Sequence, residues 1–522
     1  MGIWGANMNS VKTLLLGTAA GLVAVAGAQA ADMPVKAAPV QYVKICSLYG
    51  DGFYYIPGTD TCLKLGGYLR VQAEYNAGAG GIITGSGTQM APQGRFTRDL
   101  TNDINYRVRG VTSWDIRQQT EYGTLRTYIR FGAENTTPAN TGGGTTFNPF
   151  WDRAFIQFAG FTVGRSQSFF DLFTYGGAYS YHNVRVSGDT GASGQNLWAY
   201  TAQFGNGFSG TLSLEDPATR KGGGTVDLQG VAFFGFNGSI INDNGLTNNN
   251  ANFGFRVPDI IANLRVDQAW GFAGISAALH DASGAYYNTA PIVNACGVTL
   301  NCVNNGRPED KYGWALAGGA KFNLPGGDMI GFNVCYSEGA AGMCTNQTTF
   351  QLYRNSDQVG LGWIADGVFA NGTQIELTRV WSALAGYEHI WNPKWRTSVG
   401  GGYVDVSYNS AAQNLIDSRV SGSLAGCGIP AAAGSVATNF TLLAGNSCNP
   451  NYSFWEAFTR TQWNPVPQLD IGMEVLYQKN NTAFKGPANL AANGSRPAVL
   501  NGLISDQDVW SAMFRWQRNF YP

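Results

Sequence analysis

The chain has 522 residues, with 70 glycines, 13% aromatic residues, 13% charged residues and a formal net charge of −1. So balanced a charge excludes the strongly basic surface with which proteins bind nucleic acid, and no nucleic-acid partner is expected. The few charges and many glycines also argue against a disordered acidic or basic tail protein.

The first 30 residues have the organisation of a secretory signal peptide. Lys12 precedes an apolar run at 14–26, and small residues follow up to Ala30. The run is shorter than the ~20 residues that a membrane-spanning helix needs, so we expect cleavage after Ala30 rather than a retained anchor. The remaining domain, 31–522, contains no apolar run of 18 or more residues. If it lies in a membrane, it must do so as a closed β-barrel.

The stretch 105–131 is predicted to form a β-hairpin with its turn at 121–124. In both arms large apolar residues alternate with polar ones, so that one face carries aromatic residues and the other is dense in arginine. Alternation alone would also fit a soluble antiparallel sheet. Because the arginine face and the aromatic face recur along the chain, the pattern favours a barrel wall with lipid outside and water inside.

Sixteen segments are predicted to be strands, and the expected fold is an all-β, 16-stranded antiparallel transmembrane barrel. Their residue numbers are 62–75, 104–119, 125–131, 151–159, 161–170, 197–205, 208–215, 259–267, 272–280, 312–323, 328–337, 377–390, 395–407, 453–464, 468–479 and 508–520. Short, turn-forming connections alternate with long ones of about 19 to about 45 residues. Outer-membrane barrels show this asymmetry, because their periplasmic turns are short and their outer loops are long. A β-sandwich remains an alternative from strand count alone.

Three stretches resemble a known family. They are 43–70 (VKICSLYGDGFYYIPGTDTCLKLGGYLR), 154–171 (AFIQFAGFTVGRSQSFFD) and 460–472 (RTQWNPVPQLDIG). They are similar to the porins of α-proteobacteria, the rhizobial and Brucella-type family, and with the final strand the likeness covers essentially the whole exported chain. The resemblance implies an outer-membrane location, a homotrimer and a third long loop that folds into the lumen.

The candidate pore constriction combines a basic wall with that loop. The wall consists of the inward arginines of the first three strands, which are Arg70, Arg107, Arg109, Arg117, Arg126 and Arg130. The resemblance places the third long connection, 171–196, in the lumen, where Asp171 and Asp189 could face the wall. Opposed charges across a constriction orient dipolar solutes and set ion preference. For each arginine, a solvated wall position away from the narrowest level remains the alternative, and Arg265, Arg396 and Arg515 are weaker inward candidates.

Eight cysteines fall into four neighbouring couples, which in an exported chain indicates disulfides. The sequence does not determine their connectivity, and nearest-neighbour pairing is the preferred hypothesis: Cys46 with Cys62, Cys296 with Cys302, Cys335 with Cys344, and Cys427 with Cys448. There is no CxxC motif, and the three histidines stand far apart. Neither a metal site nor a cofactor is therefore expected.

The sequence predicts a water-filled channel for passive diffusion of ions and small hydrophilic solutes, surrounded by outer-membrane lipid. An enzyme is not expected, because His182, His280 and His389 belong to no recognisable motif and GxSxG, HExxH and P-loop sequences are missing. A structural or adhesive barrel, whose long loops bind surface partners, remains the alternative function.

Overall fold

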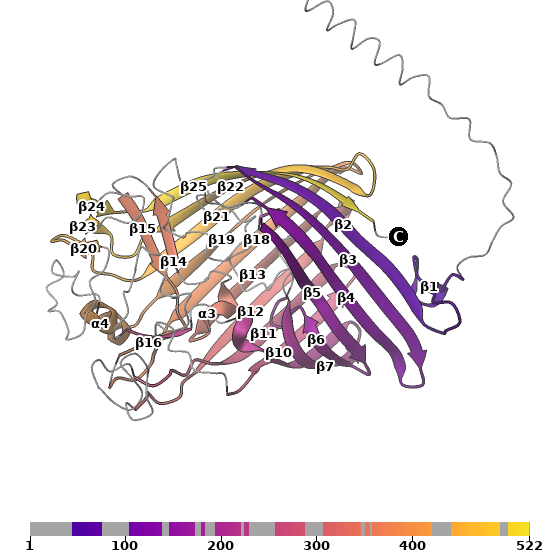
Figure 1. Cartoon of the computed structure of the whole chain (residues 1–522), viewed down its shortest axis with the longest axis horizontal. Coiled ribbons are helices and arrows are strands. Elements are labelled where there is room, and N and C mark those ends of the chain that lie inside the picture. The colour runs from indigo at the N-terminus through magenta and orange to yellow at the C-terminus, as the bar shows by residue number, and fades with distance from the viewer. Residues whose placement is uncertain are drawn as a thin grey trace, which may run out of the picture. The chain divides into compact units, whose positions relative to one another are not determined.

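The computed structural model describes residues 44–75, 104–137, 146–172, 179–182, 194–220, 224–228, 256–287, 306–345, 350–354, 358–370, 372–419, 440–490 and 499–520. Its main sheet has 17 strands, and without the two-residue strand β1 (Tyr54–Tyr55) sixteen antiparallel strands remain. These sixteen close into a barrel, because β2 pairs with β3 on one side and with β25 on the other (Figure 1). The predicted fold is confirmed.

The barrel strands follow one another around the wall in chain order. They are β2 (Cys62–Tyr75), β3 (Ile104–Thr120), β4 (Gly123–Thr136), β5 (Thr146–Phe158), β6 (Phe161–Ser166), β7 (Gln195–Gly205), β8 (Phe208–Glu215), β10 (Asp259–Gln268), β11 (Gly271–Asp281), β12 (Tyr312–Asn323), β13 (Met329–Glu338), β18 (Arg379–Asn392), β19 (Trp395–Ser407), β21 (Tyr452–Trp463), β22 (Leu469–Asn481) and β25 (Gln507–Asn519). Each of the sixteen predicted segments overlaps one of these strands.

Three strand bounds differ clearly from the prediction. β4 and β5 are longer than predicted at the ends that face the long loop between them, whereas β6 ends at Ser166 instead of 170. A register shift at Arg130/Phe131 interrupts the pairing of β4 with β5. Beyond this bulge, Asn, Thr and Pro replace the apolar alternation, and Pro149 still pairs with Ala133. The apolar alternation therefore ends before the hydrogen-bonded pairing does, and the sequence pattern underestimates the length of these two strands.

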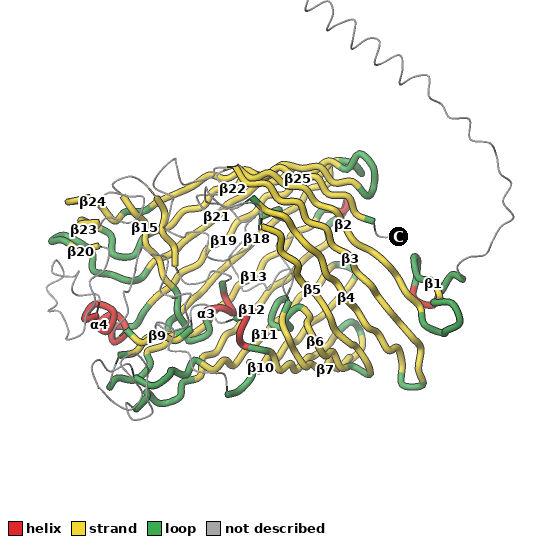
Figure 2. Tube along the Cα trace, in the orientation of Figure 1, coloured by secondary structure: helices red, strands yellow, loops and turns green. Residues whose placement is uncertain are grey.

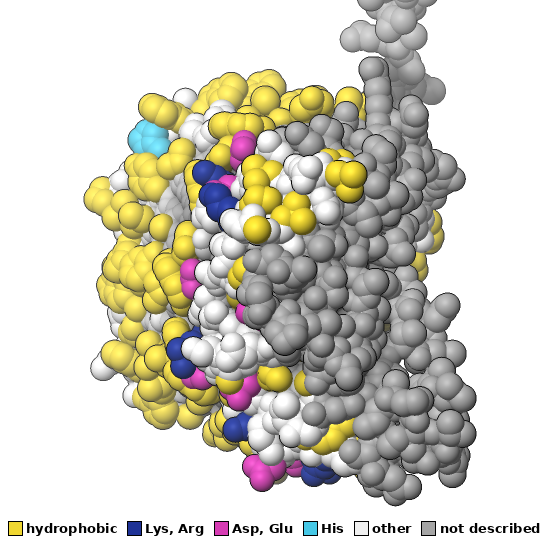
Figure 3. All heavy atoms as spheres, turned by 90° about the vertical axis from the view of Figure 1, so that its left-hand side faces the viewer, with side chains coloured by type: hydrophobic (Ala, Val, Ile, Leu, Met, Phe, Trp, Pro, Cys, Tyr) yellow, Lys and Arg dark blue, Asp and Glu magenta, His cyan; other side chains and the backbone are white. Residues whose placement is uncertain are grey.

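The outer face of the barrel is apolar and the inner face is mostly small or polar. On β12, Trp314 and Leu316 are exposed while Ala315 and Ala317 are buried. Aromatic side chains near strand ends are exposed, among them Tyr75, Trp270, Trp391, Trp395 and Trp463. Figure 3, which looks at the long-loop end, shows hydrophobic side chains along the edge of the barrel and charged ones inside that edge. This is the distribution expected of a barrel in lipid.

The two rims of the barrel differ in their connections. Short turns join the strands at one rim, including the 3₁₀ turn η5 (Pro325–Gly327), and the long connections all leave the other. The long-loop rim lies at the left of Figure 1 and the C-terminus at the opposite rim. Figure 2 shows the short helices among these connections. No helix in the described part of the chain has the length and hydropathy required to cross a membrane.

The long connections carry secondary structure of their own, which was not predicted. These elements are η3 (Pro217–Thr219), β9 (Thr225–Asp227), α3 (Ala341–Cys344), β14 (Phe350–Arg354), β15 (Gln358–Trp363), β16 (Gly367–Phe369), β17 (Glu376–Leu377), α4 (Ser410–Arg419), β20 (Phe440–Leu442), β23 (Gly486–Leu490) and β24 (Val499–Ile504). β9 pairs in parallel with β16, so two different connections join each other.

The largest hydrophobic cluster lies on the inner side of the wall. It joins inward residues of the wall, such as Ala315 on β12 and Val404 on β19, to loop residues such as Val226, Met343 and Val368. The clustered wall residues come from β10 to β13, β18, β19, β21 and β22, and none of those described comes from β3, β4 or β5. The loop residues of this cluster therefore pack against the wall from β10 to β22 and not against β3, β4 or β5.

Two of the predicted disulfides are confirmed. Cys46 is bonded to Cys62, which ties the turn η1 (Ser47–Tyr49) and β1 to the start of β2, and Cys335 is bonded to Cys344, which ties α3 to β13. Cys448 is also disulfide-bonded. The other predicted members, Cys296, Cys302 and Cys427, lie outside the described residues.

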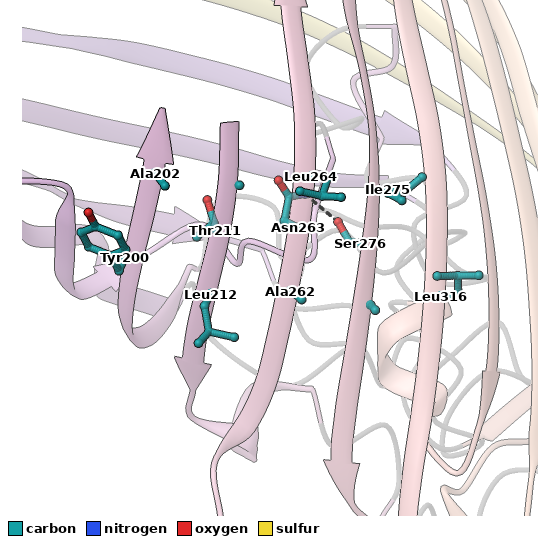
Figure 4. A pocket seen from close by; sticks show the side chains of 12 residues that line it. Tyr200, Ala202, Thr211, Leu212, Ala262, Asn263, Leu264, Ile275, Ser276 and Leu316 are labelled. Atoms are coloured by element: carbon teal, nitrogen blue, oxygen red, sulfur yellow. Dashed lines mark hydrogen bonds between the residues drawn. The ribbon is translucent and has the colours of Figure 1, made fainter. Parts of the chain in front are cut away.

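A shallow apolar depression lies on the outer wall over β7, β8 and β10 to β12, and Figure 4 shows the side chains that line it. Tyr200, Leu212, Leu264 and Leu316 surround it, and the small side chain of Ala262 forms part of its floor. Its lining is almost wholly apolar and it faces outward, so it belongs to the lipid-facing surface and not to the lumen.

Candidate functional site

The connection between β6 and β7 enters the lumen, as the resemblance implied. Its first described part follows the inner face of β8 and β10: the Phe169 amide donates to Glu215 Oε1 (2.9 Å), and Arg265 Nη1 donates to the Leu172 carbonyl (2.7 Å). Leu172 also packs against β11, where a Cβ on Gly274 would lie 2.9 Å from Leu172 Cδ2. The loop thus lies flat against the inner wall on this side.

The second described part, residues 179–182, is bound to strands much farther along the wall. We call it the latch. Ser398 Oγ on β19 donates to the Tyr179 carbonyl (2.5 Å), and Tyr181 OH donates to Asp470 Oδ1 on β22 (2.8 Å). Arg515 Nη2 on β25 donates to the Tyr181 carbonyl (3.0 Å), and its guanidinium lies 3.9 Å from the centre of the Tyr181 ring. The two described parts of this connection therefore contact β8, β10 and β11 in one case and β19, β22 and β25 in the other.

His182 is the most strongly bound residue of the latch. Its Nδ1 lies 2.7 Å from Glu474 Oε1 on β22, and its Nε2 lies 3.1 Å from Glu74 Oε1 on β2. Ser180 Oγ donates to the same Glu474 oxygen (2.6 Å). Burial alone would lower the pKa of His182, but the attraction and hydrogen bonds of Glu474 and Glu74 outweigh it and raise the pKa to about 10. At neutral pH the latch therefore holds a charged histidine between two carboxylates.

All six predicted wall arginines lie on the inward face of β2, β3 or β4, alternating with outward residues. Arg107 and Arg109 share one carboxylate, Glu134 on β4, at 3.6 Å and 2.7 Å. Arg107 Nε also donates to Gln72 Oε1 on β2 (2.9 Å). Because one anion serves two cations here, the cluster carries a net positive charge.

Arg70 and Arg130 extend this group. Their guanidinium groups lie 4.7 Å and 5.7 Å from the centre of the same ring, that of Tyr68. Arg70 is the register partner of Arg109, and Arg130 Nε lies 3.3 Å from Asp152 Oδ2 on β5. The structure thus brings four of the six predicted residues together around one region of the wall.

Arg117 and Arg126 form a separate pair near the short-turn rim. Both bind Asp115, at 2.8 Å and 2.9 Å, and the Arg117 guanidinium lies 5.0 Å from the Phe53 ring centre in the N-terminal segment. Arg117 is eight residues farther along β3 than Arg109, which corresponds to roughly 27 Å of extended strand. The wall arginines therefore occupy two levels. We call Arg70, Arg107, Arg109 and Arg130 the upper arginine group, and of the two levels only this group lies near the latch.

The described part of the structure places neither of the two predicted loop aspartates opposite the arginine wall. Asp171 forms an ion pair with Arg220, and its side chain is completely buried. Asp189 lies outside the described residues, and its role stays a prediction.

A further arginine cluster lies on β18, β19 and β21, on the other side of the latch from Arg515. Glu388 on β18 binds Arg460 (2.5 Å) and Arg396 (3.6 Å), so again one carboxylate serves two arginines. The Arg460 guanidinium also lies 5.1 Å from the Tyr181 ring centre, on the latch. Arg460 therefore faces the lumen.

Sequence reasoning missed the acids that hold the latch and the wall, above all Glu74, Glu474 and Glu134. A signal for them was present, since each falls on the inward parity of its strand. Which partner each one meets depends on the register between strands and on the path of the loop, and neither can be deduced from a periodic pattern.

Comparison with known proteins places these features in a family. A family model described as "Porin subfamily" matches residues 32–511. The chain is 32% identical over 331 residues to Porin Omp2b of Brucella suis, covering 60% of this chain and 80% of that protein. It is 29% identical over 374 residues to Porin Omp2a of Brucella melitensis biotype 1, covering 66% and 89%. Among solved structures, the outer membrane channel DcaP of Acinetobacter baumannii has a similar fold, with a TM-score of 0.53 at 12% identity over 89% of this chain and 99% of that one.

Proposed function

The chain belongs to the porin subfamily, and we propose that it is a passive outer-membrane channel whose narrowest level lies between the latch and the upper arginine group. It lets ions and small hydrophilic solutes diffuse through a water-filled barrel in the bacterial outer membrane, and it is a channel rather than an enzyme. A barrel of sixteen strands is too wide for wall side chains alone to fill, so an inward loop has to set its cross-section.

The proposal is supported mainly by the position of the latch, which lies at the same level of the barrel as the upper arginine group. Arg515, which binds the Tyr181 carbonyl, is the register partner of Gln72 on β2. Gln72 is in turn the register partner of Arg107 on β3. Latch and upper arginines therefore occupy one row across three neighbouring strands, where a solute that passes the loop would also meet the arginines. The field of those fixed charges would act on it at short range.

Two matched double variants test this placement. Arg107→Gln with Arg109→Gln removes two charges around Glu134 at the latch level, and Arg117→Gln with Arg126→Gln removes two charges around Asp115 near the short-turn rim. In planar bilayers under a KCl gradient, we expect the first pair to move the reversal potential toward cation preference by clearly more than the second. Equal shifts, or no shift in the first pair, would remove the upper arginines from the constriction.

Three copies of the channel form a homotrimer in this proposal. Support comes from a small and polar gap in the outward face of β3, where Gly110 and Thr112 stand between the exposed Val108 and Trp114. Small residues allow close approach of a neighbouring protein wall. Native mass spectrometry of the detergent-purified protein should give a trimer, and Gly110→Arg should give folded monomers; a monomeric wild type would contradict the assembly.

Residues 1–30 act as a signal peptide that is removed during export. What supports this is the lysine, apolar run and small residues described above. The mass of protein purified from outer membranes should correspond to a chain that starts at Ala31, and a retained N-terminus would refute the cleavage.

A further inference from the structure

Two arginines at the seam between β25 and β2 are held by neutral groups, unlike the other wall arginines. Arg70 Nε donates to the side-chain oxygen of Gln517 (2.6 Å), and Arg515 Nη2 donates to the Tyr181 carbonyl (3.0 Å). Within the described ranges no carboxylate lies within ion-pair distance of either guanidinium. Arg515 Nε is buried and has no hydrogen-bond partner among the described atoms.

The acids of the neighbouring strand β22 are occupied by the latch. Asp470 Oδ1 accepts from Tyr181 OH (2.8 Å), and Glu474 binds His182 (2.7 Å) and Ser180 (2.6 Å). Glu474 and Glu74 together face the buried His182 side chain. These carboxylates thus stabilise the loop through direct contacts with latch residues, and Asp470 also attracts Arg70 and Arg515 from beyond ion-pair distance.

Neutral acceptors orient a guanidinium without cancelling its charge. Arg107, with the same inward parity one strand away, adds a third cation, and its Nη1 lies 3.6 Å from Glu134 Oε2. Like charges on one face of a sheet repel each other unless counter-ions screen them. A seam built in this way gains stability when a mobile anion occupies it.

We propose that Arg70, Arg107 and Arg515 form a luminal subsite for small oxyanions, that is, phosphate and carboxylate solutes. Arginine suits these ligands because its planar fork matches two oxygens of a carboxylate or phosphate. Arg70 is only partly buried and provides the accessible contact, while Arg107 and Arg515 lie deeper and add attraction from behind. The subsite rests on the proposed channel and specifies its solute class: the pore favours anions and holds oxyanions briefly as they pass.

The test uses inorganic phosphate as the probe and chloride current as the readout. Purified trimers or monomers in planar bilayers are titrated with phosphate at constant chloride concentration. The wild type should show anion preference and a concentration-dependent reduction of chloride conductance. Arg70→Gln should raise the half-blocking phosphate concentration about tenfold, the value of one charged hydrogen bond. Arg70→Lys, which keeps the charge but loses the fork, should retain the anion preference and weaken the block.

Arg518→Gln is the matched control. It removes the same charge from the same strand, β25, but Arg518 is exposed at the short-turn rim and its side chain binds Gln468 and the Asn519 carbonyl. It should leave the phosphate block unchanged. Cation preference of the wild type, or an identical block in wild type and Arg70→Gln, overturns the subsite while the channel stands. A protein that gives no conductance at all would instead overturn the proposed function.

Discussion

Shared carboxylates are the recurring device at the level of single residues. Glu134, Asp115 and Glu388 each bind two arginines, so each cluster is structurally satisfied and still positively charged. A fully paired wall would be electrically neutral, and a wall of unpaired arginines would repel itself. Sharing gives fixed orientation together with residual charge, which is what a selective aqueous lumen requires.

His182 gives the latch a pH dependence with a defined sign. Its pKa is raised in the folded state from 6.5 to about 10, so the stabilisation is complete below about pH 6.5 and is lost as the pH rises toward 10. His182→Gln should cost about 3 kcal/mol at pH 6.5, because it leaves Glu74 and Glu474 facing each other uncompensated. Thermal unfolding in detergent should show the wild type losing stability between pH 6.5 and 10 and the variant losing much less.

His389→Gln serves as the comparison for this measurement. His389 also binds a carboxylate, Asp328 (2.8 Å), but it stands near the short-turn rim with about a third of its side chain exposed. Its loss should leave the alkaline destabilisation intact. If His182→Gln retains the full alkaline loss, the proton on His182 is not what stabilises the latch.

Alternation in the sequence predicted which way side chains point, and the structure agrees for all six wall arginines. It could not predict their partners, because those are set by contacts between residues distant in the chain. Glu474 lies 292 residues after His182, and the two meet only because the connection that follows β6 reaches β22. Asp171 illustrates the same limit, since its partner Arg220 lies in the next long connection.

At the level of elements, the strands were predictable and the loop structure was not. A strand in a barrel wall has one face in lipid and one in water, so its period is visible in the sequence. β9, α3 and β16 pack inside the long-loop end, where burial surrounds them on several sides, and their short segments show no period of two. The parallel pairing of β9 with β16 joins residues about 140 positions apart, which local patterns do not encode.

The Cys46–Cys62 disulfide is expected to stabilise one element in particular, the N-terminal segment 46–61. The bond closes a loop with a sequence separation of 16, which is worth about 3 kcal/mol in the chain-entropy model. Replacing both cysteines by serine should make this segment open to proteases and weaken its ring contacts with Arg117. Hydrogen exchange of 46–61 is the direct measurement, and heat resistance should also fall.

The second disulfide supplies the control, because Cys335–Cys344 lies at the long-loop end. Replacing Cys335 and Cys344 by serine should leave the hydrogen exchange of residues 46–61 as in the wild type and should increase hydrogen exchange around α3. Unchanged protection of 46–61 after loss of Cys46 and Cys62 would show that the bond contributes nothing to holding the segment.

At the level of the whole molecule, the barrel depends on joining its first and last strands. β2 and β25 pair over eight residues, from Tyr68 with Asn519 to Tyr75 with Ala512. The ladder then ends, and the Phe520 amide donates to the Gly67 carbonyl (2.9 Å) while its ring covers Gly67. A Cβ at Gly67 would lie 2.2 Å from the Val111 carbonyl oxygen and 2.6 Å from the Phe520 ring. Only glycine fits at this point of closure.

Gly67→Ala should therefore weaken closure of the entire barrel by about 2 kcal/mol or more, because either β3 or the C-terminal ring has to move. Gly110→Ala is the matched control on the adjacent strand, since a Cβ there meets nothing within 4 Å. The fraction of refolded protein that keeps fast mobility on unheated SDS gels should fall for Gly67→Ala and stay at the wild-type value for Gly110→Ala. Equal yields for the two variants would mean that the seam tolerates a displaced Phe520, and closure would then rest on the β2–β25 ladder alone.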